Sequence, residues 1–452
     1  MTVLQSTSAR KNPLNGGKFL CLGFAALILL GTILLALPVS SATSSGIGLF
    51  QALFTATSSV CVTGLTVINA GQDLSRFGQV VLMLLIQVGG LGFLVFSTLL
   101  FVIIGKRITL KDRLLIRESM NTDQLSGLIR LVEWAFLLTI SVELTGAAIL
   151  SIRLIPRFGW GEGIFMSVFH AVSAFCNAGF DLLGSDSLIS LQSDPLILFP
   201  IMLLITTGGL GFALLSDLVH NRRFSRMAVH TRLVLLLSAI MTVSGTLFVL
   251  LLEWNNPATL GALPFWERIM NALFQSVSLR TAGFASIDQA ALRPATKLLS
   301  SVCMLIGAAP ASTGGGVKLT TFACLILLVV SIARGREHAV LFRHTIPRKQ
   351  MERAACVFLI AIAVVFLDIL LLSVFEPAHA LEDVMYEAIS AVATVGLSCN
   401  MTGSLSVAGR IIIIITMFIG RVGPLTLALA IGRQQSASKD KIRYPEAQIM
   451  IG

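Results

Sequence analysis

The chain has 452 residues, a formal net charge of +10 and a mean hydropathy of +0.88, with 55% hydrophobic and only 12% charged residues. Soluble proteins carry about twice this charged fraction, so the composition excludes an ordinary soluble globular protein. Apolar runs of roughly 20 residues can cross a hydrocarbon core about 30 Å thick, and helices satisfy the backbone there. We therefore expect a membrane protein with several spanning helices.

The first apolar run, 19–37, follows the basic residues Arg10, Lys11 and Lys18. A cleaved signal peptide has the same order of features. This run is long for the hydrophobic region of such a peptide, and it precedes the first loop as later runs precede later loops. The sequence therefore favours a retained first span.

The chain divides into four successive units, which we place at 1–104, 105–219, 220–333 and 334–452. Each unit contains a span, a short loop and a second span. The predicted spans are 19–37, 77–104, 128–150, 195–219, 233–252, 298–332, 354–375 and 411–431, and the predicted loops are 50–65, 165–180, 270–284 and 384–397. This pattern predicts an all-α membrane protein of four tandem M1–P-loop–M2 repeats around a pseudo-fourfold pore. It would have eight full transmembrane helices and four re-entrant pore helices.

The four loops share one pattern, in which an aromatic residue is followed by Ser and then by Gly and an apolar residue. The copies read FTATSSVCVTGL, FHAVSAFCNAGF, FQSVSLRTAGF and YEAISAVATVGL. Their glycines, at 64, 179, 283 and 396, lie 104 to 115 residues apart. The alternative is four helix-breaking glycines in ordinary spans, but four copies at near-equal spacing favour one shared site.

A cation that enters a bilayer must exchange water oxygens for protein oxygens, which backbone carbonyls can supply. Glycine allows the backbone conformations that such a site needs, and irregular backbone at membrane depth is tolerated where it lines a cavity. We therefore predict a cation selectivity filter that consists of Val62, Thr63, Gly64, Asn177, Ala178, Gly179, Thr281, Ala282, Gly283, Thr394, Val395 and Gly396.

The second span of the third unit is interrupted by a run of small residues. Pro310 removes a helix donor and glycine is a poor helix former. Lys318 would be a charge inside the membrane, which makes a function the default hypothesis. The alternative is a linker between two half-spans. The interrupting segment consists of Gly307, Ala308, Ala309, Pro310, Ala311, Ser312, Thr313, Gly314, Gly315 and Gly316.

Two arginines at membrane depth need an explanation. Arg280 directly precedes the third filter segment, where its charge would repel a cation, so we expect its side chain to point away and to pair with Glu387. Arg421 lies in the last span, where it must face water, a carboxylate or carbonyl groups. The repeated motif GGLGF, at 89–93 and 208–212, predicts close helix packing, with a hinge as the alternative.

Most of the 33 lysines and arginines lie between the units or at the termini, and few lie beside the loops. By the positive-inside rule, both termini and the connections between units lie in the cytoplasm. The basic cytoplasmic face suggests anionic lipid or an acidic partner and no nucleic acid. The seven cysteines form no CxxC pair, which predicts neither a disulfide framework nor a zinc site.

Several motifs resemble those of the Trk/Ktr/HKT cation transporter superfamily, most closely the membrane subunits of the Ktr branch. They are SVCVTGLTV, CNAGF, RTAGF, ATVGL, the two GGLGF copies, ASTGGGVKLTT and IGRVGPLT. The resemblance implies potassium uptake, because glycine at all four filter positions goes with potassium preference. It also implies that 307–318 is an intramembrane gating loop and that Arg421 lies beside the pore, where it hinders cations when the loop is shut.

The resemblance further implies a homodimer in a bacterial inner membrane, whose contact includes the C-terminal tail KIRYPEAQIMIG. It implies a cytoplasmic octameric ring of RCK subunits (KtrA-like) that bind ATP or ADP, with docking surfaces at 105–118, 220–232 and 334–353. Potassium is the transported ion, sodium is expected to stimulate uptake, and no organic cofactor is expected on this chain.

Three other functions fit the sequence less well. A sodium-coupled secondary transporter with alternating access needs inverted repeats, whereas these four units enter the membrane in the same orientation. An enzyme would need convergent acid, base or metal-ligating residues, and the glycine-rich run lacks phosphate-loop spacing. A membrane scaffold does not explain four filter-like loops.

Overall fold

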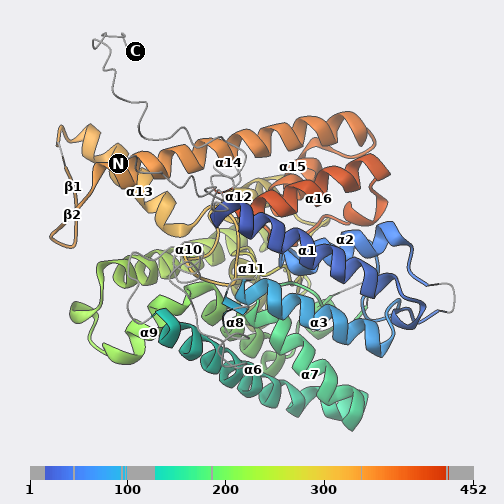
Figure 1. Cartoon of the computed structure of the whole chain (residues 1–452). Helices are drawn as coiled ribbons and strands as arrows, with labels where there is room; N and C mark the ends of the chain where they lie inside the picture. The colour runs from blue at the N-terminus through green and yellow to red at the C-terminus, as the bar shows by residue number, and fades with distance from the viewer. Residues whose placement is uncertain are drawn as a thin grey trace, which may run out of the picture.

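The computed structural model describes residues 16–43, 46–92, 95, 96, 98, 128–184, 187–336, 338–423 and 426. A long helix followed by a shorter one recurs four times along the chain (Figure 1). The four long helices are α1 (Gly16–Ala36), α6 (Leu128–Phe158), α10 (Val229–Glu253) and α14 (Arg348–Phe375). The four shorter helices that follow them are α2 (Leu49–Val60), α7 (Trp160–Phe175), α11 (Phe265–Ser278) and α15 (Leu381–Val392).

After each of these pairs comes a further helical segment. These helices are α3 (Arg76–Leu91), α8 (Pro195–Leu210) with α9 (Phe212–His220), α12 (Pro294–Leu305) with α13 (Leu319–Ala333), and α16 (Val407–Val422). A two-stranded antiparallel hairpin, β1 (Ala339–Leu341) and β2 (His344–Ile346), precedes α14. Short 3-10 turns lie at Pro38–Ser40, Ile189–Leu191, Phe224–Arg226 and Thr402–Ser404.

The helices pack in a closed order. Each third-segment helix contacts the short helix of the next group: α3 packs on α7, α8 on α11 and α12 on α15. The order closes because α16, at the end of the chain, packs on α2 near its beginning. The four short helices are therefore linked in a ring that joins the two ends of the chain.

The predicted count of eight full transmembrane helices is not confirmed by the described residues. Among the described residues, four helices are long and apolar enough to cross a membrane, namely α1, α6, α10 and α14, and the bent pair α8–α9 makes a possible fifth. In three of the predicted second spans a helix ends at a glycine with positive φ: Gly92 (86°), Gly211 (89°) and Gly423 (91°). At Gly211 the helix axis turns by 97° between α8 and α9.

The reason for these breaks lies in the motifs GGLG and GRVG, whose last glycine adopts a conformation that other residues avoid. The close packing predicted for the GGLGF copies is present, whereas a hinge motion there stays a prediction. Their first glycines permit close packing and their last glycine ends the helix. Most of the remainder of 77–104 and of 411–431 lies outside the described residues.

The core sits around the short helices. The motif aromatic residues Phe54, Phe169, Phe274 and Tyr386 are all fully buried, at 0% exposure. The long helices instead expose large apolar side chains on one face, such as Leu144 and Phe366. Apolar patches of this extent mark a membrane or protein contact, and they place the short helices inside a shell of lipid-compatible helices.

Candidate functional site

The loops that follow the four short helices adopt one backbone conformation. In each, the residue two before the glycine has a positive φ: Val62 (56°), Asn177 (59°), Thr281 (66°) and Thr394 (51°). The glycines also have positive φ: Gly64 (96°), Gly179 (70°), Gly283 (79°) and Gly396 (95°). A non-glycine residue rarely adopts this conformation, so its recurrence at four equivalent positions indicates one local design.

The motif serine holds each loop. Its carbonyl oxygen accepts the amide N–H of the residue before the glycine. The distances are 2.8 Å for Thr63 to Ser58, 2.8 Å for Ala178 to Ser173, 3.0 Å for Ala282 to Ser278 and 2.8 Å for Val395 to Ser390. These serines are fully buried. From the sequence, no role is predicted for this serine, although its distance from the glycine, six residues in three loops and five in the third, was the signal.

The serine hydroxyl forms a second hydrogen bond, whose partner differs between the loops. In the first and fourth loops it accepts from the glycine N–H, at 3.0 Å for Ser58 to Gly64 and 3.0 Å for Ser390 to Gly396. In the other two loops it donates to the carbonyl of the aromatic residue after the glycine, as Ser173 does to Phe180 at 2.7 Å. Both arrangements fix the loop without using the filter carbonyls.

The four glycines converge on one another. A Cβ added to Gly64 would lie 2.6 Å from the carbonyl oxygen of Ala178, and one added to Gly179 would lie 2.8 Å from Gly283 Cα. A Cβ on Gly283 would lie 2.6 Å from the carbonyl oxygen of Val395, and one on Gly396 would collide with the carbonyl of Thr63. Each loop thus touches the next, and the fourth touches the first.

Among the described residues, the carbonyl groups of these loops have no hydrogen-bond partner. In the described part of the chain, no hydrogen bond ends on the carbonyl oxygens of residues 62–64, 177–179, 281–283 or 394–396. Most of these residues are fully buried, and only Gly283 and Gly396 are partly exposed. Buried carbonyls are nearly always paired, so twelve together form a site whose chemistry suits a cation.

The segment between α12 and α13 forms a loop whose two ends are hydrogen-bonded to each other. Ile306 and Val317 form a parallel bridge, and Gly307 N–H donates to Val317 O at 2.8 Å. Leu319 N–H donates to Ala308 O at 3.2 Å. The intervening residues therefore project as one compact loop, which we call the 307–318 loop.

The 307–318 loop docks on the broken end of α8. Ala309 N–H donates to Gly209 O at 3.1 Å, and Thr313 N–H donates to Gly208 O at 3.3 Å. In return, Phe212 N–H donates to Ala311 O at 3.0 Å. A helix that ends leaves backbone groups without partners, and these bonds satisfy groups freed by the break at Gly211.

The same loop lies against the first residues of three filter segments. Thr313 Oγ1 donates to Phe175 O at 3.1 Å. Gly314 fits so closely that an added Cβ would lie 3.4 Å from Asn177 Nδ2 and would collide with Thr281 Oγ1, and Gly315 is similarly close to Thr394. The three glycines at 314–316 all lie in contact with residues of the filter segments or, for Gly316, with Ala393 directly before one of them. A side chain at these positions would therefore not fit between the 307–318 loop and the filter segments.

Two basic side chains, those of Arg421 and Lys318, donate hydrogen bonds to carbonyl groups of the 307–318 loop. Arg421 Nη1 donates to Thr313 O at 2.5 Å, and its Nη2 donates to Gly89 O and, at 3.1 Å, to Gly90 O. Lys318 Nζ donates to Gly314 O at 2.7 Å. Arg421 therefore joins the end of α3 to the middle of the loop, and its partners are carbonyl groups rather than a carboxylate.

The predicted pair of Arg280 with Glu387 does not form. The Arg280 guanidinium donates to Ser238 O at 3.4 Å, Ser238 Oγ at 3.2 Å and Thr242 Oγ1 at 3.2 Å, all on α10. Glu387 instead accepts from Thr402. Arg280 does turn away from the carbonyl groups, but polar groups of the neighbouring helix take the place of the expected carboxylate.

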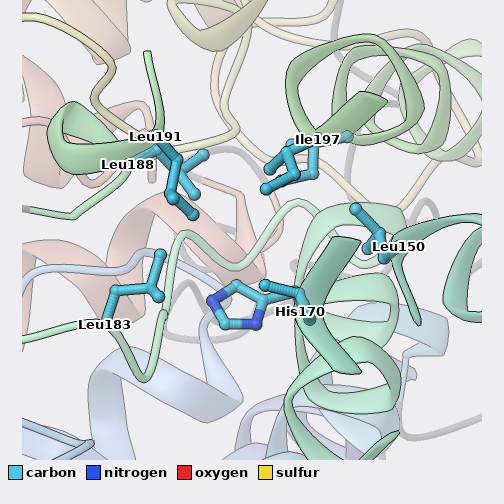
Figure 2. Close-up of a pocket in the computed structure, with 8 residues that line it drawn as sticks. Leu150, His170, Leu183, Leu188, Leu191 and Ile197 are labelled. Carbon is cyan, nitrogen blue, oxygen red and sulfur yellow. The ribbon is translucent and has the colours of Figure 1, made fainter. Parts of the chain in front are cut away.

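Two other features lie apart from these loops. The small cavity in Figure 2 is lined by leucine and isoleucine side chains and His170, and it leaves no room for a water molecule. His170 Nδ1 contacts Met166 O at 2.7 Å, which fits a packed side chain. Among the described residues, no group of three His, Cys, Asp or Glu could hold a metal ion. The predicted C-terminal tail and the basic segment 105–118 lie outside the described residues.

Comparison with known proteins places the chain in a family. The TrkH family, described as cation transport proteins, matches residues 23–441. The Ktr system potassium uptake protein B of Bacillus subtilis (strain 168) is 42% identical over 433 residues, 96% of each chain. The potassium/sodium uptake protein NtpJ of Enterococcus hirae is 36% identical over 455 residues, 100% of each chain.

The fold has a match among solved structures. The potassium transporter TrkH from Vibrio parahaemolyticus superposes with a TM-score of 0.75 at 17% identity, covering 94% of this chain and 86% of that chain. At that identity the likeness speaks for the fold alone. The family expected from the motifs is confirmed: the chain belongs to the TrkH family of cation transport proteins, and it is a transporter rather than an enzyme.

Proposed function

We propose that this chain takes up potassium through a selectivity filter made by the carbonyl groups of its four loops. The observation that carries the proposal is the convergence of Gly64, Gly179, Gly283 and Gly396, each against the next loop. The twelve carbonyls of these loops accept no hydrogen bond from any described residue. A dehydrated cation needs oxygen ligands on several sides. Four loops around one axis supply them, and a single loop cannot.

Potassium is the proposed ion for two reasons. The Bacillus subtilis and Enterococcus hirae relatives are named as potassium uptake and potassium/sodium uptake proteins. All four loops carry glycine at the filter position, and the carbonyl oxygens, rather than side chains, would then set the ion preference. The name of the Enterococcus relative pairs potassium with sodium, and sodium is the proposed stimulating ion for this chain.

The 307–318 loop is the proposed gate. It lies against the filter segments at Phe175, Asn177, Thr281 and Thr394, where an ion leaving the filter would pass. Lys318 and Arg421 bring two positive charges to this position. In this conformation the loop and its cations oppose passage, and opening requires that the loop leave its contacts with α8 and Arg421.

The membrane arrangement follows the same plan. The four units would surround a pseudo-fourfold pore, with the long helices facing lipid and the second helices broken at their glycines. The excess of basic residues between units supports cytoplasmic termini in a bacterial inner membrane. A homodimer and a cytoplasmic octameric RCK ring that binds ATP or ADP complete the proposal, by analogy with the Ktr system relatives.

Uptake of potassium, rubidium and sodium tests the proposal. The chain is expressed in a bacterium without its own potassium uptake systems, with and without a KtrA-like ring subunit. We expect uptake of potassium and rubidium that exceeds sodium uptake and that rises with the ring. Sodium uptake that equals potassium uptake, or uptake that is strictly coupled to a sodium gradient, would contradict a potassium-selective filter.

A further inference from the structure

Three arginines surround a cleft just beyond the end of α9. The cleft has a volume of about 350 Å³ and is lined by Val219, His220, Asn221, Arg222, Arg223 and Arg226. In the described part of the chain, none of the three guanidinium groups forms an ion pair. Three unpaired positive charges around one opening form a site for an anion.

The carboxylate of Asp217 stabilises the segment that carries the arginines. Asp217 accepts from Asn221 Nδ2 at 2.8 Å and from Ala228 N–H at 2.9 Å, so it ties both ends of the segment together. Its oxygens are thereby occupied within the loop. A 3-10 turn, closed by Arg226 N–H to Arg223 O at 2.9 Å, brings two of the arginines onto one turn.

The surroundings of the cleft are apolar. Leu218, Val219 and Phe224 are 38%, 59% and 50% exposed. Phe224 packs edge-on against Phe342 of the β-hairpin turn, with ring centroids 6.4 Å apart, and Figure 1 shows the hairpin at the same end of the molecule as α9. Positive charge beside exposed apolar side chains is typical of the boundary between hydrocarbon and phospholipid headgroups.

We propose that this cleft binds the phosphate of an anionic phospholipid, such as phosphatidylglycerol, whose acyl chains contact the exposed side chains of Leu218, Val219 and Phe224. The lipid would then occupy this part of the segment 220–232, which the ring subunit would leave free. The arginines match the phosphate, since guanidinium groups bind phosphate oxygens through paired donors. The exposed leucine, valine and phenylalanine match the acyl chains and would gain nothing from a free phosphate ion. None of the six residues that line the cleft is acidic.

The position of the cleft connects it to the proposed gate. Phe212, the first residue of α9, donates its N–H to Ala311 O of the 307–318 loop, and the cleft lies at the other end of the same helix. A lipid that fixes the far end of α9 therefore stabilises the bent α8–α9 conformation on which the loop is docked. This consequence for transport rests on the proposed function, whereas the binding does not.

Binding is measured on the full chain, purified in a nonionic detergent and depleted of lipid, by native mass spectrometry during titration with phosphatidylglycerol. We expect the variant R222A/R223A/R226A to bind about a hundredfold more weakly, since each basic residue near an anionic headgroup contributes a factor of about five. The variant R222K/R223K/R226K, which keeps the charges, should lose far less. The control R334A/R336A/K349A, which removes three exposed basic residues elsewhere on the same cytoplasmic side, should bind as the wild type does.

Three results would overturn the proposal. The alanine variant could bind phosphatidylglycerol as the wild type does, phosphatidylcholine could bind equally well, or inorganic phosphate alone could compete at equal concentration. The last result would make the cleft a free-anion site. Normal lipid binding in a chain that takes up no potassium would count against the proposed function alone, and an unaffected alanine variant in a potassium-transporting chain would count against this inference alone.

Discussion

The Arg421 guanidinium donates to the Thr313 carbonyl at 2.5 Å, so a cation of the last described helix holds the middle of the 307–318 loop. The same guanidinium also binds the carbonyls of Gly89 and Gly90 at the end of α3. Arg421 and Gly89 lie 332 residues apart in the chain. A loop held in this way cannot leave its place under the filter segments unless these bonds break first.

Replacing Arg421 by alanine should raise potassium uptake without the ring subunit by about tenfold or more. A hydrogen bond to a charged group contributes about 1.5–3 kcal/mol, and its loss would favour the open loop. The matched variant Arg421→Lys keeps the charge but not the planar set of donors, so we expect an intermediate rate. Equal potassium uptake by the wild type, Arg421→Ala and Arg421→Lys would show that Arg421 does not contribute to gating.

Deletion of 311–316 should remove the gate. Potassium uptake should rise several-fold and should no longer depend on the ring subunit, because the contacts with Phe175, Thr281 and Thr394 are lost together. The variant Ser312→Ala, whose hydroxyl bonds only to Ala309 O at 2.6 Å within the loop, is the control and should behave as wild type. A deletion variant that is correctly folded by gel filtration but still needs the ring would rule out this gate.

The motif serines should matter for selectivity. Ser58→Ala removes the hydroxyl that accepts from Gly64 N–H, which costs about 1 kcal/mol and loosens the loop. We expect the ratio of potassium to sodium uptake to fall several-fold while the amount of protein in the membrane changes little. The neighbouring Ser59→Ala is the control, since the Ser59 hydroxyl bonds only within its own helix, to Thr55 O at 2.5 Å and Ala56 O at 3.2 Å. If Ser58→Ala and Ser59→Ala have the same ratio of potassium to sodium uptake, the Ser58 hydroxyl does not contribute to selectivity.

The filter glycines should tolerate no side chain. Gly179→Ala would place a methyl group 2.8 Å from Gly283 Cα, in a backbone conformation that alanine avoids. Potassium uptake should fall at least a hundredfold. Gly161→Ala on α7 has open space around its Cβ and should transport normally.

The sequence predicted the features that repeat. The four loops and the glycine of each could be predicted because one pattern returns at near-equal spacing, and the interruption of the third unit because Pro310 and the glycines around it disfavour a helix. The helix breaks at Gly92, Gly211 and Gly423 were not predicted, because small residues in an apolar run fit close packing as well as a turn. Only the bonds that the 307–318 loop makes to Gly208 and Gly209 reveal what the break in α8 provides.

The partners of the buried arginines could not be read from the sequence either. A search for opposite charge selected Glu387 for Arg280, but the guanidinium is satisfied by Ser238 and Thr242 on α10. Hydroxyl and carbonyl groups are too common in the sequence to be identified as partners before the packing of α10 on α11 is known. The same holds for Arg421, whose partners are all backbone carbonyls.

The most direct test of the account is the position of a potassium-like ion in crystals of the protein. Anomalous scattering from crystals soaked in thallium or rubidium salt locates the ion independently of any assumption about the protein. The account predicts a peak on the axis between the four loops, within coordination distance of the carbonyls of residues 62–64, 177–179, 281–283 and 394–396. Ions that bind reproducibly elsewhere in the membrane region, with none at these carbonyls, would contradict it.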